Sequence, residues 1–413
     1  MQKASGHCDQ PGHTAAVLTT CLIGFSLFFD LYFTQIILGP IAEAFGATVL
    51  QARYTMVAAT AGVVFAPLFA GRLQQKKAVQ VATLAAMAIA ALIEAAAPNL
   101  WTLIGMRFCQ GILVGVLFVE AMGRIAVIHR ARFGAFSNGL FVSATTLGSF
   151  TSRFLPPSLV DEFGIKATFL VLASVLLLIC AAVHFSPVPE VSTDASREPA
   201  VPAAAASGQR KAFVVEYLLG FCILFSQTSI WTYLPVRLAR APFMLYDRQL
   251  ALMAFVFLLG AVSASLTICV TRNDLSRSAI SLFFGCAAVG ALMTGTFNLY
   301  AIAGGLAVFT VGSFALQAML SRRLMVRAGA ATPRIFAAYM SIYYMGGSAG
   351  SYLSGDIFAA RGFSGVVVAV MTIAALGGTA LYMREALGPA LRWRAAMRTQ
   401  TPLDSEAKMA GQP

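Results

Sequence analysis

The chain has 413 residues, of which 58% are hydrophobic and only 11% are charged, and its formal net charge is +12. Because a soluble globular chain has about 25% charged residues, this composition excludes a soluble fold and predicts a protein embedded in a lipid bilayer. The Lys and Arg residues lie between apolar runs instead of on one face, so the positive charge indicates membrane topology and no nucleic-acid partner.

The apolar runs predict twelve transmembrane helices in two sets of six. Each run is about 20 residues long, which is the length that a helix needs to cross about 30 Å of hydrocarbon. Between the sets, residues 188–211 are rich in Ala, Pro, Ser and Glu and predict a flexible linker. The runs are 15–38, 52–71, 79–97, 100–120, 136–160 and 167–187, followed by 212–236, 249–271, 278–297, 299–320, 335–358 and 363–383.

The charges in the loops predict the orientation of the helices. Most of the 29 Lys and Arg residues fall in the termini, the linker and the loops on the same side. Because positive charge collects in cytoplasmic loops, both termini are expected in the cytoplasm. The first 13 residues do not have the pattern of a cleaved signal peptide. The predicted parts are an N-terminal six-helix bundle (1–187), a cytoplasmic linker (188–211), a C-terminal six-helix bundle (212–385) and a cytoplasmic tail (386–413).

The sequence contains few groups that could carry catalysis. No two of the seven cysteines form a CxxC motif, and no GxxxxGK[ST] motif occurs. No nucleophile–base or metal-ligand pattern stands out, so we expect neither an enzyme nor a cofactor nor a metal site. A membrane-embedded sensor or enzyme is therefore disfavoured against a transporter that draws on a gradient of an ion or of its substrate.

The two halves are similar to each other. The first predicted span contains Gly24 and Phe25, and the seventh contains Gly220 and Phe221 in the same pattern. A further match joins residues 147–150 of the fifth span to residues 349–352 of the eleventh. Matches at the same place in both halves indicate a parallel duplication of a six-helix unit.

Three stretches resemble the major facilitator superfamily. Residues 103–111, LIGMRFCQG, are similar to the fourth-helix motif of that family. Residues 139–157 are similar to the Gly-rich fifth helix of its proton-coupled antiporters, without their usual Gly-Pro pair. Residues 32–46 and 233–243 resemble helix ends in a bacterial sugar, drug and metabolite efflux branch. The resemblance covers about 13–385 and implies two pseudo-symmetric six-helix bundles, a monomer and a place in the bacterial inner membrane.

One loop departs from the family pattern. Where the family has Asp between helices two and three, this chain has Gly71, although Arg72, Lys76 and Lys77 keep the basic character of the loop. In the family this Asp helps to close the cytoplasmic side, so its absence changes the latch. Asp274, in the corresponding loop of the second half, is a candidate substitute. The expected gating residues are therefore Arg72, Lys76, Lys77 and Asp274.

Ionisable residues inside a span are costly to bury and are functional candidates by default. Asp30 lies about 22 Å along its helix from the cytoplasmic end, and Arg107 lies about 20 Å from the same side. In the resembled fold, helices one and four both line the central cavity. We therefore expect Asp30 and Arg107 to interact. Two interpretations stay open: a pair that couples transport to protons, and an ion pair that only tethers two helices.

Two further intramembrane sites have alternative interpretations. Glu120 and Arg124 are four residues apart and suit either an interfacial ion pair or a relay for substrate or protons. Arg153, in the outer third of span five, either snorkels to the outer interface or attracts an anionic substrate. Asp356, in the outer part of span eleven, is a candidate partner for Arg153 or a charge at the end of a loop.

Polar and aromatic residues at comparable depth form a candidate substrate site, because small-molecule sites combine apolar walls with a few polar groups. Helix packing or an interfacial aromatic belt is the alternative interpretation, and the belt applies best to Trp231 and Tyr233. The predicted substrate-binding residues are Tyr32, Gln35, Glu120, Arg153, Gln227, Trp231, Tyr343 and Tyr344.

The sequence thus predicts a secondary transporter that exports a small organic molecule by proton antiport with alternating access. The candidate substrates are a drug, a sugar, a siderophore or another metabolite. The alternative is an uptake carrier for a small metabolite, and the intramembrane Arg107 and Arg153 favour an organic anion for it. The expected partners are the substrate, protons and the lipid bilayer.

Overall fold

The computed structural model describes residues 11–70, 76–129, 134–187, 213–270, 277–328 and 332–399. Every element in these ranges is a helix, so the predicted all-α class is confirmed. Within them, nine helical stretches are long and apolar enough to cross a membrane. The chain is a multi-pass membrane protein. The predicted linker, 188–211, lies outside the described residues.

The first half of the chain begins with an interrupted helix. Residues 15–38 were expected to form one span, but α1 ends at Leu31 and residues 32–37 are not helical. The apolar run continues through this break, which is why hydropathy alone does not reveal it. The helices of this half are α1 (Pro11–Leu31), α2 (Leu38–Ala44), α3 (Val49–Ala52), α4 (Tyr54–Ala70), α5 (Lys77–Ala95), α6 (Leu100–His129) and α7 (Gly134–Phe185).

The second half follows the same order of long helices. Its last helix extends to Thr399, so residues 386–399 of the predicted tail are helical. The elements are α9 (Val214–Leu238), α10 (Asp247–Leu252), the 3-10 turn η2 (Met253–Phe255), α11 (Val256–Val270), α12 (Arg277–Thr294), α13 (Leu299–Ala328) and α14 (Thr332–Thr399).

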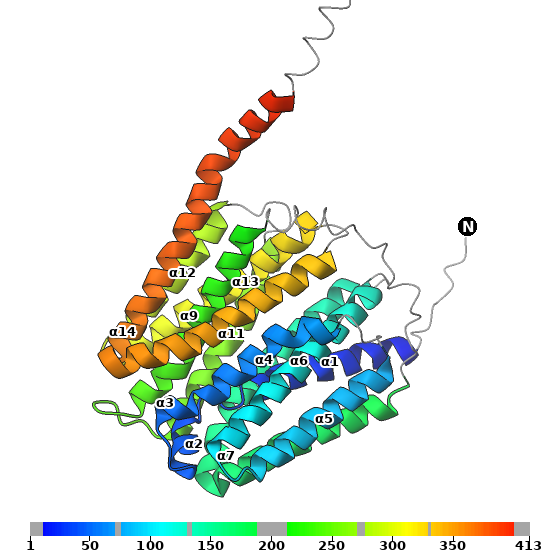
Figure 1. Ribbon diagram of the computed structural model, residues 1–413, viewed down its shortest axis with the longest axis vertical. Helices are drawn as coiled ribbons and strands as arrows, with labels where there is room; N and C mark the ends of the chain where they lie inside the picture. The colour runs from blue at the N-terminus through cyan, green and yellow to red at the C-terminus, as the bar shows by residue number, and fades with distance from the viewer. Residues whose placement is uncertain are drawn as a thin grey trace, which may run out of the picture.

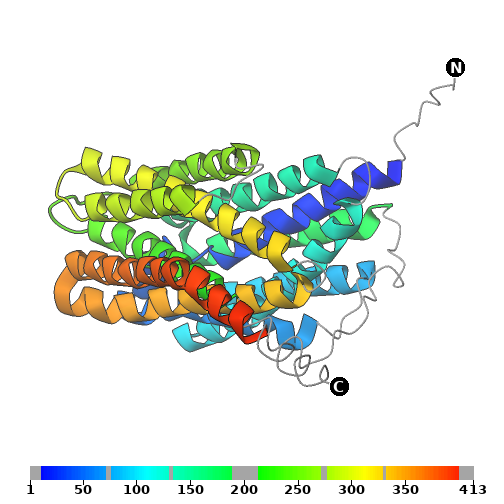
Figure 2. The same cartoon turned by 90° about the horizontal axis from the view of Figure 1, so that it is seen from above.

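Two helices, α7 and α14, each contain two spans. Gly164 has φ 78° and ψ 173°, and Gly362 has φ 65° and ψ −165°, so helical geometry stops at both residues. Positive φ is readily adopted only by glycine, which has no Cβ. Figure 2 shows α14 turning back beside itself at one end of the bundle. With α7 and α14 each divided at its glycine, and with the shorter apolar helix Ser278–Thr294 included, the described residues contain twelve apolar helical segments.

The two halves lie side by side (Figure 1). They meet where α4 packs along α14 and where α10 and α11 pack against α7. We call the end of the bundle that carries Gly164 and Gly362 the distal end, and the end at which α1 begins the proximal end. This arrangement places the interface between the halves along the middle of the molecule.

Glycines allow close contact of helix backbones inside both halves. A Cβ at Gly148 of α7 would collide with the backbone of Phe25 in α1, and a Cβ at Gly350 of α14 would collide with that of Phe225 in α9. Close backbone approach at small residues is a common form of helix packing in membranes. This close packing at equivalent glycines gives a physical reason for the sequence similarity between the halves.

The contact between α4 and α6 also depends on glycines at the points where the two backbones meet. A Cβ at Gly111 would collide with the carbonyl oxygen of Ala59, and a Cβ at Gly62 would collide with that of Phe108. Gly105, also on α6, is exposed and has no neighbour within 4 Å of its Cβ position. Gly111 and Gly105 therefore form a matched pair for mutation on one helix.

We predict that Gly111→Ala lowers the free energy of unfolding by about 1–3 kcal/mol, because the added methyl group forces α4 and α6 apart. Gly105→Ala is the control, and we expect it to leave stability unchanged or to raise it slightly, since alanine favours the helix. The measurement is thermal unfolding of both purified variants in detergent. Equal midpoints for the two variants would contradict the close contact.

Candidate functional site

Arg107, on α6, holds the end of α1. Its Nη2 donates hydrogen bonds to the backbone carbonyl oxygens of Asp30, at 2.5 Å, and Leu31, at 3.1 Å. Its Nη1 donates to Oδ1 of Asp30, at 3.2 Å, and to Oε1 of Gln110, at 2.6 Å. The last carbonyls of a helix have no partner within that helix, and a cation there is favoured by the helix dipole. One guanidinium therefore caps α1 and also pairs with its carboxylate.

A second carboxylate, Glu94 of α5, joins this contact. Its Oε1 lies 3.8 Å from Nη1 of Arg107, and the side chains of Asp30, Glu94 and Arg107 are all fully buried. The side-chain amide of Gln110 also interacts with Glu94, whereas Oδ2 of Asp30 has no hydrogen-bond partner among the described residues. We call Asp30, Glu94 and Arg107 the charge cluster.

The charge cluster contains two carboxyl groups and one guanidinium. With both carboxylates ionised it would carry one uncompensated negative charge in fully buried surroundings. An uncompensated buried charge is costly, and one bound proton removes it. The charge cluster can therefore bind and release a proton.

Glu94 was missed by the sequence analysis, although a signal existed. It is an ionisable residue inside the predicted run 79–97, and it lies only three residues before the end of that run. A carboxylate at that place resembles an interfacial charge. Its contact with Arg107 depends on which face of α5 meets α6, and hydropathy does not give this information.

Arg153 of α7 forms a second buried cationic centre. It is only 3% exposed, so the expectation that it snorkels to the outer interface is wrong. Its guanidinium carbon lies 4.2 Å from the ring centre of Tyr32, 5.8 Å from that of Trp231 and 4.1 Å from that of Phe257. Asp356 is not its partner, because that carboxylate pairs with Arg53 at 2.7 Å.

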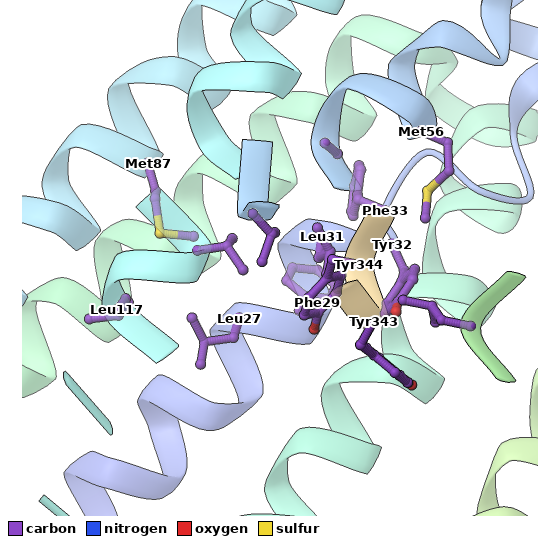
Figure 3. Packing of buried hydrophobic residues seen from close by; sticks show 14 of the residues in the cluster. Leu27, Phe29, Leu31, Tyr32, Phe33, Met56, Met87, Leu117, Tyr343 and Tyr344 are labelled. Atoms are coloured by element: carbon purple, nitrogen blue, oxygen red, sulfur yellow. The ribbon is translucent and has the colours of Figure 1, made fainter. Parts of the chain in front are cut away.

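Other predicted substrate-binding residues lie close to Tyr32 or follow it along the chain. Tyr32 follows the end of α1, and Figure 3 shows it beside Tyr343 and Tyr344 of α14. The rings of Tyr343 and Tyr344 are 5.4 Å apart and perpendicular. Gln35 donates a hydrogen bond from Nε2 to the hydroxyl of Thr232 at 3.2 Å.

Two aromatic residues of α9, Trp231 and Tyr233, are buried as well. Trp231 is 1% exposed and Tyr233 is 0% exposed, so the interfacial belt interpretation is wrong for both. Trp231 packs on Phe257 with ring centres 4.3 Å apart. In the described part of the chain, Nε1 of Trp231 and Nε2 of Gln227 are buried without a hydrogen-bond partner.

Polar contacts join the halves from the centre toward the distal end. Arg53, at the end of α3, pairs with Asp356 of α14, and the Arg53 guanidinium carbon lies 5.1 Å from the ring centre of Tyr352. The hydroxyls of Thr60 in α4 and Ser348 in α14 are 2.8 Å apart. These contacts hold the distal ends of α4 and α14 together.

The family model of the Major Facilitator Superfamily matches residues 20–351, which is most of the chain. The chain belongs to the Major Facilitator Superfamily. It is a membrane transporter of this type, and the resemblance noted in its sequence is confirmed.

Individual relatives align with this chain over most of their length and of its own. A transporter of Buchnera aphidicola subsp. Schizaphis graminum (strain Sg) is 25% identical over 344 residues, which cover 80% of this chain and 82% of the relative. The inner membrane transport protein YnfM of Escherichia coli (strain K12) is 25% identical over 376 residues, which cover 87% and 89%. The match therefore extends over both six-helix halves.

A solved structure shares the fold. It is the crystal structure of a bacterial homolog to the human lysosomal transporter Spinster, in an inward-facing and unoccupied conformation. Its TM-score is 0.69 at 12% identity, with 91% of this chain and 97% of that chain covered. At this identity the likeness concerns the fold alone, which is the major facilitator fold.

Other predicted site residues lie away from the two cationic centres of this superfamily member. Glu120 is buried on α6, about 20 Å along the helix from Arg107. Lys77 donates a hydrogen bond to the carbonyl oxygen of Ser186 at 2.6 Å, which ties the start of α5 to the end of α7 within one half. Lys76 precedes α5 and makes no side-chain capping bond. Arg72 and Asp274 lie outside the described residues.

We predict that Arg107→Gln lowers the free energy of unfolding by about 3–5 kcal/mol, because it leaves a buried carboxylate without its cation. The measurement is thermal unfolding in detergent, with the double variant Asp30→Asn and Arg107→Gln as the comparison. The double variant should recover part of the loss, since it removes the unpaired carboxylate. Losses that simply add would contradict a direct interaction between the two side chains.

Proposed function

We propose that this chain exports a small organic molecule across the bacterial inner membrane in exchange for protons. The observation that carries the proposal is the charge cluster, with two carboxyl groups against one guanidinium in fully buried surroundings. Both termini lie in the cytoplasm in this proposal, so the distal end faces the periplasm. The six-helix bundles, 1–187 and 212–385, are its two moving units, and the molecule works as a monomer.

The coupling step follows from the position of Arg107. Its hydrogen bond to the carboxylate of Asp30 is strongest while that carboxylate is ionised, whereas its bonds to the backbone carbonyls at the end of α1 do not depend on ionisation. A further proton, taken up by the remaining carboxylate of the cluster, weakens the attraction to Arg107 and loosens the contact between α1 and α6. Because a proton binds the two arrangements with different affinity, the proton gradient shifts the balance between them.

Alternating access requires the halves to rock about a central site. The pairs Arg53–Asp356 and Thr60–Ser348 would close the periplasmic side and separate when that side opens. The solved Spinster homolog adopts an inward-facing conformation, and closure of the distal end here is compatible with that state. Arg72, Lys76, Lys77 and Asp274 remain the proposed gating residues of the cytoplasmic side.

Uptake of a small metabolite is the second candidate. The buried Arg153 favours an organic anion, and an anion is compatible with either direction of transport. The direction of substrate flow relative to an imposed proton gradient separates the two candidates. Export of the substrate from the side that corresponds to the cytoplasm, against inward proton flow, supports the first.

We predict that Asp30→Asn abolishes proton-driven transport, because the variant lacks the ionisable group that pairs with Arg107. The substrate is first identified by comparing metabolites inside and outside cells with and without the wild type. Transport is then measured in proteoliposomes with an imposed pH gradient. Glu94→Gln should weaken the dependence on the gradient, since it removes the second carboxyl group of the cluster.

Glu162→Gln is the control for Asp30→Asn, because Glu162 is an exposed carboxylate near the distal end and lies outside the cluster. It should transport at the wild-type rate. Full gradient-driven transport by Asp30→Asn would reject its role in coupling and leave the Asp30–Arg107 pair as a structural tether. A wild type that moves no compound would reject the transport proposal itself.

A further inference from the structure

Arg153 is a buried cation without a carboxylate partner in the described part of the chain. The ion pairs there engage Asp30 and Glu94 with Arg107, Asp356 with Arg53, and Glu216 with Arg323 and Arg327, and none reaches Arg153. Its surroundings are instead the rings of Tyr32, Trp231 and Phe257. A charge in such surroundings needs compensation, since an unpaired ion pays a large desolvation penalty when it is buried.

The hydrogen bonds of Arg153 use little of its capacity. Nη1 donates to the carbonyl oxygen of Ser149 at 2.8 Å and to the hydroxyl of Ser152 at 3.4 Å, both on the same helix. Nε has no acceptor among the described residues. A guanidinium has five N–H donors and no acceptor. The aromatic rings attract the charge, and the hydrogen bonds of Arg153 in the described part of the chain go to Ser149 and Ser152, not to the hydroxyl of Tyr32.

Two more unpaired donors lie on the neighbouring face of α9. The indole Nε1 of Trp231 and the amide Nε2 of Gln227 are buried without acceptors in the described residues. They are four residues apart, so they share one face of the helix. Most of the unmatched groups here are donors next to a positive charge, beside one unmatched acceptor, Oε1 of Gln35, and the donors call for a partner rich in acceptors.

We propose that Arg153 binds an anionic group of the transported molecule, a carboxylate, phosphate or sulfonate, and that the rings beside it hold the adjoining apolar part. The forked guanidinium matches the paired oxygens of such groups. This proposal rests on the proposed transport function and specifies its substrate class. It holds for export and for uptake.

The position of Arg153 suits a transported ligand. Arg153 and Tyr32 belong to the N-terminal half, while Trp231 and Phe257 belong to the C-terminal half. A ligand held here contacts both halves, so its affinity differs between the relative arrangements of the two halves. That difference is what a transported molecule needs to bias the exchange between states.

The first test compares soluble metabolites in cells and medium for the wild type, Arg153→Gln, Arg153→Lys and an empty vector. Every compound that the wild type moves should carry a group that is anionic at neutral pH. Arg153→Gln should move these compounds more than about tenfold more slowly, since it removes a charged hydrogen-bond donor. Arg153→Lys keeps the positive charge but lacks the forked guanidinium, and it should retain part of the transport rate.

The outcomes of this test distinguish failure of the anion assignment from failure of the transport proposal. Transport of neutral or cationic compounds alone, or of anions at the wild-type rate by Arg153→Gln, overturns the anion assignment and leaves the transport function intact. A wild type that moves nothing contradicts the transport function instead, and a direct binding measurement then decides the anion assignment.

Binding is measured by the fluorescence of Trp231 in the purified full chain. The other two tryptophans, Trp101 and Trp393, are replaced by Phe. The probes are benzoate, phenyl phosphate and benzenesulfonate, with neutral benzamide as the control. We expect a saturable change with at least one anion, none with benzamide, and loss of the response in Arg153→Gln.

A monodisperse Arg153→Lys sample with a weakened response shows that the loss is not unfolding. No saturable response to any of the three anions, or an equal response to benzamide, overturns the proposal. Phosphatidylglycerol distinguishes a lipid headgroup from a soluble substrate. A response to this lipid and to none of the soluble anions contradicts binding of a soluble substrate at Arg153.

Discussion

The contact between Arg107 and the end of α1 is the constraint on which the central region depends. A backbone carbonyl within a membrane protein must be satisfied from inside the protein, because hydrocarbon offers no donor. Arg107 satisfies two carbonyls at the end of α1 and the carboxylate of Asp30 with one guanidinium. The helix can therefore end at Leu31 although the apolar sequence continues. The same contact gathers the ionisable groups that make proton exchange chemically possible.

The break after Leu31 also connects the two cationic centres. The non-helical residues that follow bring Tyr32 over Arg153 and Gln35 to Thr232 of the C-terminal half. Arg107 has more carboxyl groups around it than it can neutralise, whereas Arg153 is surrounded by rings. A proton suits the first centre and an anion suits the second. Since α1 contributes to both, a movement of α1 caused by protonation would reach the site around Arg153.

Much of the fold could be predicted, because apolar runs long enough to cross a membrane leave few alternatives. The meeting of Asp30 and Arg107 could also be anticipated, since the rise per residue gives the depth of each along its helix and the resembled fold places helices one and four around one cavity. Depth does not tell which faces of the helices meet, so Glu94 was missed and Asp356 was considered for Arg153 instead of Arg53. Burial of Trp231 and Tyr233 depends on α11 and α14 covering α9, which hydropathy does not report.

Whether the charge cluster holds a proton is measured most directly by infrared spectroscopy of the purified full-length chain near neutral pH. A protonated carboxylic acid has a carbonyl stretch that is separate from the bands of carboxylates. The wild type should show this band, and Glu94→Gln or Asp30→Asn should remove or shift it, while Glu162→Gln should leave it unchanged. A spectrum without such a band in the wild type, or a band that neither cluster variant changes, would contradict a proton in the cluster.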